Sequence, residues 1–142
     1  MNKTLKTFLA SLLLITLAAG LAHETQTVTH GDEQHKVSVG YTTEPAYTGE
    51  RNGLALTVRT GAGESVENLA NSLTAELTAP TGEKLSLALR AVHGQPGSYT
   101  DDFVLTQPGV YRLTVSGFIG AAEVNLTFDL HEVAPIEELR FP

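Results

Sequence analysis

The chain has 142 residues, a length that accommodates one domain, and its nine basic and 16 acidic residues give a formal net charge of −7. This acidic balance argues against a polyanionic partner, and no nucleic-acid partner is expected. The chain contains no cysteine, which excludes disulfides, thiolate metal sites and thiol catalysis. The fold must therefore be held together by its apolar core.

The first 22 residues have the composition of a secretory signal peptide. Two early lysines precede an apolar run, Phe8–Ala19, which is too short for an ordinary membrane span. Gly20 and Ala22 are small residues at the −3 and −1 positions for cleavage after Ala22. We therefore expect residues 1–22 to be removed, leaving a periplasmic or secreted protein that begins at His23 and has no transmembrane segment.

Residues 23–34, HETQTVTHGDEQ, are polar, and Val28 is their one strongly apolar side chain. We expect this segment to be a polar N-terminal arm that is either flexible or forms a weak first strand. After it, apolar and polar residues alternate with the period of two that is typical of half-buried strands. The alternating segments are 36–41, 54–59, 73–78, 85–90, 111–115 and 123–130.

The segment 98–105 breaks this alternation. If Tyr99 and Phe103 face the core, Asp101 falls where an apolar residue belongs, and a β-bulge or an edge strand would resolve the conflict. Asp101 and Asp102 are expected to point to opposite faces of the sheet, as neighbours in a strand do. We therefore do not expect them to act together on one substrate atom.

Short turns rich in glycine, proline and asparagine separate the segments, and the longest connection is 60–72. In QPGVYRLTVSG, Tyr111 lies near the start of a strand, the position of the tyrosine-corner residue in immunoglobulin domains. This pattern predicts an antiparallel immunoglobulin-like β-sandwich of about seven strands over residues 35–131. Residues 132–142 contain two prolines and are expected to form a loosely held C-terminal tail.

The five histidines are the one unusual chemical resource of this chain, and carboxylates beside them could complete a divalent metal site. The chain has no G-x-S-x-G, no phosphate-binding glycine loop and no H-E-x-x-H, so we expect no enzymatic activity. Strict up-and-down alternation of the strands would bring four of the five histidines to one end of the sandwich: His23, His30, His35 and His93. The same alternation places Glu64 and Glu67 at that end and His131 at the opposite end.

Cleavage after Ala22 would give His23 a free α-amine. This amine and Nδ1 of the same residue could chelate one divalent ion, and imidazole ligands suit copper(II). The predicted metal site therefore consists of His23, completed by His30, His35 or His93, with copper(II) as the expected cofactor.

Two stretches of the chain resemble a known group of proteins: VSVGYTTEPAYTGERNGLALTV (37–58) and HGQPGSYTDDFVLTQPGVYRLTVSGFIG (93–120). They are similar to exported bacterial immunoglobulin-like proteins of the YtkA-like and CopC-like copper-resistance group. The resemblance implies a β-sandwich that binds Cu(II) through an N-terminal histidine, a role that only His23 matches by position. The Met-rich segment that some relatives use for Cu(I) is missing, since the only methionine is Met1.

Two further interpretations stay open. The chain could be a non-metal interaction or adhesion module that presents a sheet edge or loops to another exported or membrane protein, with incidental histidines. A histidine-brace oxidative enzyme, similar to the polysaccharide monooxygenases, is the third interpretation. It is the weakest of the three, because most of the four tyrosines look structural and none is marked as an axial metal ligand.

Overall fold

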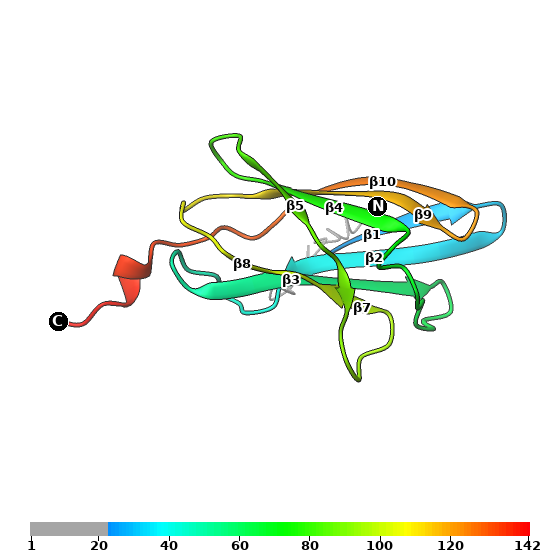
Figure 1. Cartoon of the computed structure of the whole chain (residues 1–142), viewed down its shortest axis with the longest axis horizontal. Helices are drawn as coiled ribbons and strands as arrows, with labels where there is room; N and C mark the ends of the chain where they lie inside the picture. Colours follow the sequence, from blue (N-terminus) through cyan, green and yellow to red (C-terminus); the bar gives the residue numbers. More distant parts are fainter. Residues whose placement is uncertain (1–22) are drawn as a thin grey trace, which may run out of the picture.

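The computed structural model describes residues 23–142 and shows two antiparallel β-sheets packed face to face (Figure 1). The predicted all-β sandwich is therefore confirmed. The predicted signal peptide, residues 1–22, lies outside the described residues. Within residues 23–142, no helix is long and apolar enough to cross a membrane.

The first sheet has the strand order β1-β2-β3-β7-β6, and β8 pairs with the beginning of β3. Its strands are β1 (Glu24–His30), β2 (Glu33–Tyr41), β3 (Arg51–Thr60), β6 (Arg90–Ala91), β7 (Ser98–Thr100) and β8 (Asp102–Val104). The second sheet, in the order β10-β9-β4-β5, consists of β4 (Leu73–Thr78), β5 (Lys84–Leu87), β9 (Arg112–Ile119) and β10 (Ala122–Asp129). The chain changes sheet after β3, β5 and β8, as strands of immunoglobulin-like domains do.

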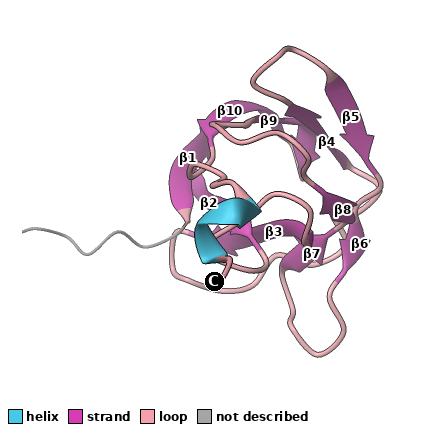
Figure 2. Cartoon of the chain, turned by 90° about the vertical axis from the view of Figure 1, so that its left-hand side faces the viewer, coloured by secondary structure: helices cyan, strands magenta, loops and turns pink. Residues whose placement is uncertain are grey.

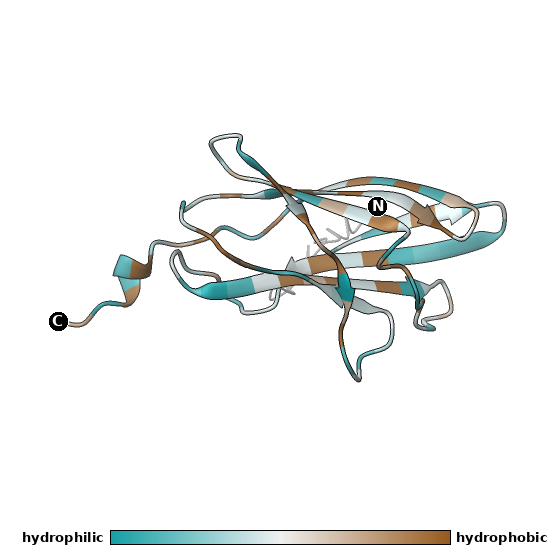
Figure 3. Cartoon of the chain, viewed as in Figure 1, coloured by the Kyte–Doolittle hydropathy of each residue, from teal (hydrophilic) through white to brown (hydrophobic). Residues whose placement is uncertain are grey.

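The core lies between the sheets and is built from the inward-facing residue of each alternating pair. In β2 and β3, for example, Val37, Val39, Leu54 and Leu56 are fully buried. Figure 3 shows the resulting apolar bands along the strands. Each such side chain stabilises the fold by about 1.5–3 kcal/mol relative to full exposure, so this core holds the domain together without disulfides.

The segment 23–34 contributes a complete strand and is not a free arm. β1 pairs with β2 along its whole length, and the Gln26 side chain donates a 2.7 Å hydrogen bond to the Thr127 carbonyl of β10. Figure 2 shows β1 between β2 and β10, where it closes one side of the sandwich. Of the two predicted alternatives, a flexible arm or a first strand, the structure shows the strand. Val28 is the one buried side chain of β1, but hydrogen bonds to β2 satisfy the backbone groups of β1.

The irregular segment 98–105 divides into β7 and β8 at Asp101. Tyr99 and Phe103 face the core, and the Asp101 side chain turns toward the segment that crosses between the sheets. This crossing begins at Ala88 and separates β5 from β6, in a stretch that alternation predicts as one strand. Asp101 Oδ2 accepts the Ala88 backbone N–H at 2.8 Å, which fixes the start of the crossing.

The prediction that Asp101 and Asp102 point to opposite faces is wrong. Both carboxylates bind Arg90: Nη1 donates to Asp101 Oδ1 at 3.3 Å, and Nη2 donates to Asp102 Oδ2 at 3.0 Å. Strict alternation requires continuous strand backbone, and the strand is interrupted between β7 and β8. The two acidic side chains therefore converge on one guanidinium group.

Tyr111, which directly precedes β9, forms the predicted tyrosine corner. Its hydroxyl donates a 2.9 Å hydrogen bond to the Gln107 carbonyl and accepts the Gln107 N–H at 3.2 Å. The ring is buried, so this contact fixes the Pro-Gly turn through which the chain passes from the first sheet to the second.

The C-terminal segment 132–142 is partly docked, which differs from the predicted loose tail. Val133 is fully buried and exchanges backbone hydrogen bonds with Gly109. A single 3₁₀ turn, η1 (Ile136–Leu139), follows, and Figure 1 shows the chain leaving the body of the domain there. The first part of the segment therefore belongs to the folded domain, and its last residues project from it.

Candidate functional site

The loops distinguish the two ends of the sandwich. We refer to the end with the β1–β2 turn as the hairpin end and to the end with residues 42–50 and 131–142 as the tail end (right and left in Figure 1). Of the predicted metal ligands, His30 and His35 lie at the hairpin end, where the register of β1 with β2 makes them diagonal neighbours. His35 is only 8% exposed, so it packs as part of the core.

His23 lies far from these two histidines. It directly precedes Glu24, which is opposite Val39 toward the other end of β2. The six residue steps from Glu24 to His30 span about 20 Å of strand. The structure therefore does not bring His23 to the hairpin end, because residues 24–30 run along the sheet as a strand.

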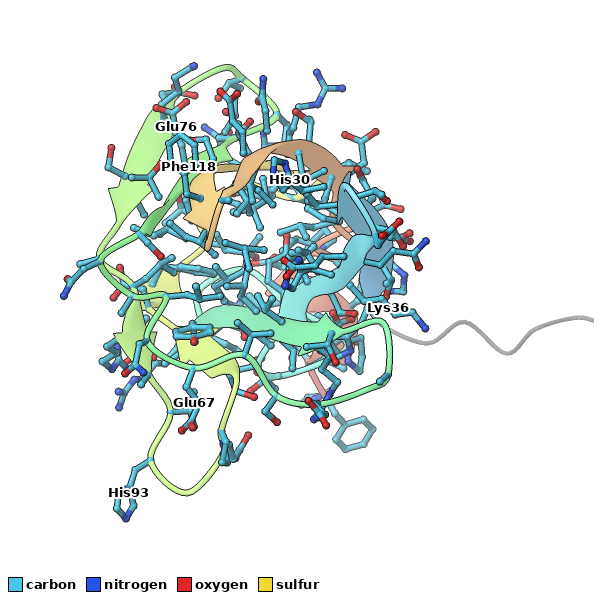
Figure 4. The ribbon with its side chains drawn as sticks, turned by 90° about the vertical axis from the view of Figure 1, so that its right-hand side faces the viewer. His30, Lys36, Glu67, Glu76, His93 and Phe118 are labelled. Carbon is cyan, nitrogen blue, oxygen red and sulfur yellow. The ribbon has the colours of Figure 1, made fainter. Side chains whose placement is uncertain are left out.

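His93 lies in the turn between β6 and β7, which projects from the first sheet. Figure 4 shows it at the tip of this turn, on the opposite side of the molecule from His30. Glu67 lies beside the same turn and lines a hollow of about 320 Å³ there. Among residues 23–142, no three histidine, aspartate or glutamate side chains are grouped closely enough to hold a metal ion.

His131, which was not among the predicted ligands, lies between two carboxylates at the tail end. Its Nε2 is 3.9 Å from Glu24 Oε1, and its Nδ1 is 3.5 Å from Glu44 Oε2. The carboxylates face different ring nitrogens, so the three groups do not converge on one ion. They instead link the start of β1 to the loop after β2 and to the end of β10.

Along β5, the sandwich is open. Leu85 is opposite Leu77 in the register of β5 with β4, so it faces the interior side of the sheet. It is nevertheless 48% exposed, whereas Leu77 is 3% exposed. A groove of about 330 Å³, which we call the β5–β8 groove, opens between the sheets and is lined mainly by Leu77, Leu85, Phe103, Val104, Leu105 and Tyr111.

Two strand edges border this groove. In the strand pairing of residues 23–142, β5 has only β4 as a neighbour and β8 has only β3. The four residues of β5 correspond to about 13 Å of strand. The Thr81 hydroxyl contacts Gln107 Oε1 at 2.7 Å near one end, and Asp101 binds Ala88 near the other. The result is a short apolar slot beside free backbone edges.

The rim of the groove carries one group of each charge. Glu83 is exposed, and a hydrogen bond from the Thr81 hydroxyl lowers the pKa of its carboxyl. Lys84 is also exposed, with Nζ 2.8 Å from Glu76 Oε1. An apolar floor and a rim of mixed charge suit a segment whose apolar and charged residues alternate.

Alternation in the sequence could not reveal this groove. The pattern predicts that Leu85 is buried like the leucines of β4. Alternation indicates on which face of the sheet a side chain lies, but it does not indicate whether another element covers that face. The irregularity at Asp101 is the one sequence signal nearby, since it marks where β7 and β8 separate.

No protein-family model and no curated protein matches the chain. Among solved structures, it is similar to a DUF4426 family protein from Pseudomonas aeruginosa, with a TM-score of 0.57 and 18% identity over 78% of this chain and 95% of that chain. A DUF4785 family protein from Legionella pneumophila matches with a TM-score of 0.49 and 13% identity, over 71% of this chain and 28% of that chain. The filamin domain of Lin-41 matches with a TM-score of 0.43 and 12% identity, over 66% of this chain and 91% of that chain.

The first of these likenesses shows the immunoglobulin-like fold, in agreement with the sequence prediction. At this level of identity it shows the fold alone. None of the three structures is described as a YtkA-like or CopC-like protein.

Proposed function

We propose that the chain is an exported interaction module that binds an extended segment of another polypeptide in the β5–β8 groove. The observation that carries this proposal is the half-exposed Leu85 on the inward side of β5. A partner that covers this side chain is favoured, because burial removes apolar surface from water. The neighbouring strand edges supply the backbone donors and acceptors that an added strand needs.

The dimensions of the groove define the kind of ligand. The four residues of β5 accommodate a strand of similar length, whose side chains would alternate between the groove floor and the rim. Apolar residues at every second position are favoured at the floor, and charged residues between them suit Glu83 and Lys84. Because so short a strand covers little area, we expect weak and reversible binding.

Selection of random peptides on the purified protein tests this proposal. We expect the selected peptides to carry apolar residues at alternate positions and to lose binding to Leu85→Glu, which places a carboxylate in the groove. Phe118→Glu is the matched control, because Phe118 is similarly exposed but lies on β9 at the hairpin end. Peptides that bind the Leu85→Glu protein as tightly as the parent protein would overturn the proposal.

Copper(II) binding and a relationship to the CopC-like proteins stay predictions from the sequence. The amine and imidazole of His23 would need no second residue to chelate an ion. However, one hollow that His23 lines is also lined by Lys36 and Arg59, whose charges disfavour a cation there. The second hollow that it lines contains Asp102, whose carboxylate already binds Arg51 and Arg90. We therefore base the proposed function on the groove and not on the histidines.

A further inference from the structure

Residues 137–142, EELRFP, form a projection at the tail end that carries two exposed apolar side chains. Phe141 is 97% exposed and Leu139 is 54% exposed. In Figure 1 this segment extends away from both sheets. Two large apolar side chains in a projecting segment favour contact with another surface.

The spacing within this segment suits an extended ligand. In a strand, Leu139 and Phe141 would face one side, while Glu138 and Arg140 would face the other. Glu137 would share the side of Leu139, but residues 139–142 already match the four residues of β5, so its carboxylate would lie beyond the end of the apolar floor. The segment now begins in η1, a single 3₁₀ turn with no buried residue. Such a short turn is weakly held, so we expect its conversion to an extended conformation to cost little.

The segment begins beside the groove. The Ile136 N–H donates to Thr48 Oγ1 at 3.1 Å, which anchors the start of the projection to the loop between β2 and β3. In the same loop, the Gly49 N–H donates to the carbonyl of Leu105, a groove residue, at 2.8 Å. The anchor and the groove therefore lie at the same end of the domain.

We propose that residues 137–142 of one copy occupy the β5–β8 groove of a second copy, and that the exchange is reciprocal. The inference rests on the proposed function and names its ligand. We infer a groove of a second copy and not the groove of the same chain, because beyond the anchor at Ile136 the segment extends away from its own sheets (Figure 1). Because the segment and the groove share one end, two copies can exchange segments about a twofold axis and close as a dimer.

The chemistry of the two surfaces is complementary. Leu139 and Phe141 would cover Leu85 and the apolar floor of the groove. On the other face of the strand, Glu138 and Arg140 carry one charge of each sign, as the rim does at Glu83 and Lys84. In the single chain Arg140 lies 3.7 Å from a third charged group, Glu137. Leu85 and Val104 of the groove and Leu139 and Phe141 of the segment are all exposed in the single chain, so the exchange requires no unfolding of the sandwich.

Analytical ultracentrifugation of the purified protein over a range of concentrations tests the proposal. We expect a monomer–dimer equilibrium whose Kd rises on the order of tenfold to hundredfold in Phe141→Ser, because this change removes a buried aromatic side chain from the contact. Leu85→Glu should weaken the dimer at least as strongly, and Phe118→Ser should leave it unchanged. A protein that stays monomeric, or a dimer that Phe141→Ser does not weaken, would overturn the proposal.

Mixing two variants distinguishes exchange from other modes of association. Leu85→Glu retains an intact projecting segment, and Phe141→Ser retains an intact groove, so the mixture should form a heterodimer through one contact. Failure to form it would refute the exchange. If the parent protein stays monomeric but binds selected peptides through Leu85, the exchange fails and the proposed function survives. If such peptides also bind Leu85→Glu unchanged, both fail.

Discussion

Replacement of Asp101 by alanine tests whether one carboxylate holds the crossing between the two sheets. This side chain, 23% exposed, accepts hydrogen bonds from the Ala88 N–H at 2.8 Å and from Arg90 Nη1 at 3.3 Å. A hydrogen bond to a charged group contributes about 1.5–3 kcal/mol, and the partly exposed ion pair adds about 1 kcal/mol or less. We expect Asp101→Ala to lower the free energy of unfolding by about 2–3 kcal/mol.

Urea unfolding followed by circular dichroism measures this loss. The midpoint should fall while the slope m stays the same, because the surface exposed on unfolding is almost unchanged. Asp102→Ala is the matched control: it removes ion pairs to Arg51 and Arg90 and should cost clearly less. Equal losses in the two variants would show that surface ion pairs, and not the bond to Ala88, hold the crossing.

Three other changes test separate parts of the structure. Gly117 has φ +123°, and an added Cβ would lie 2.1 Å from a backbone carbonyl oxygen, so Gly117→Ala should lower the unfolding free energy in the same assay by about 3 kcal/mol. The hydrogen bond from Arg51 lowers the pKa of the Asp102 carboxyl. This stabilisation is present above the unfolded-state pKa and is lost as pH falls through the folded-state pKa, and an NMR titration should show a higher pKa in Arg51→Ala. If a chain that begins at His23 binds copper(II), calorimetry should give the same affinity after His93→Ala, and a weaker affinity would contradict the separation of the two residues.

The sandwich could be predicted because strand alternation records which face of each strand avoids water. Val37 and Val39 in β2 follow this pattern and are fully buried. The tyrosine corner could also be predicted, because it joins Tyr111 to a backbone only four residues earlier. Both predictions depend on physics that operates within one strand or one turn.

The predictions that failed depended on how segments combine in space. The sequence left open whether residues 23–34 form a strand or a flexible arm, because β1 is stabilised by backbone pairing with β2 and its polar side chains do not indicate this pairing. Its presence also changes the arrangement of the histidines, because a strand that runs along the sheet separates His23 from His30. The prediction that Asp101 and Asp102 point to opposite faces required an unbroken strand. The strand is interrupted at Asp101, so the two side chains need not alternate.

The position of the β5–β8 groove follows from the crossing that Asp101 holds. β5 ends at Leu87 and the chain moves to the other sheet, so no further strand of residues 23–142 lies beside β5 to cover Leu85. An immunoglobulin-like domain could close this side with a longer strand, as β1 closes the opposite side beside β10. The short crossing instead leaves Leu85 half exposed beside two free edges, and this asymmetry between the two sides is the physical basis of the proposed binding site.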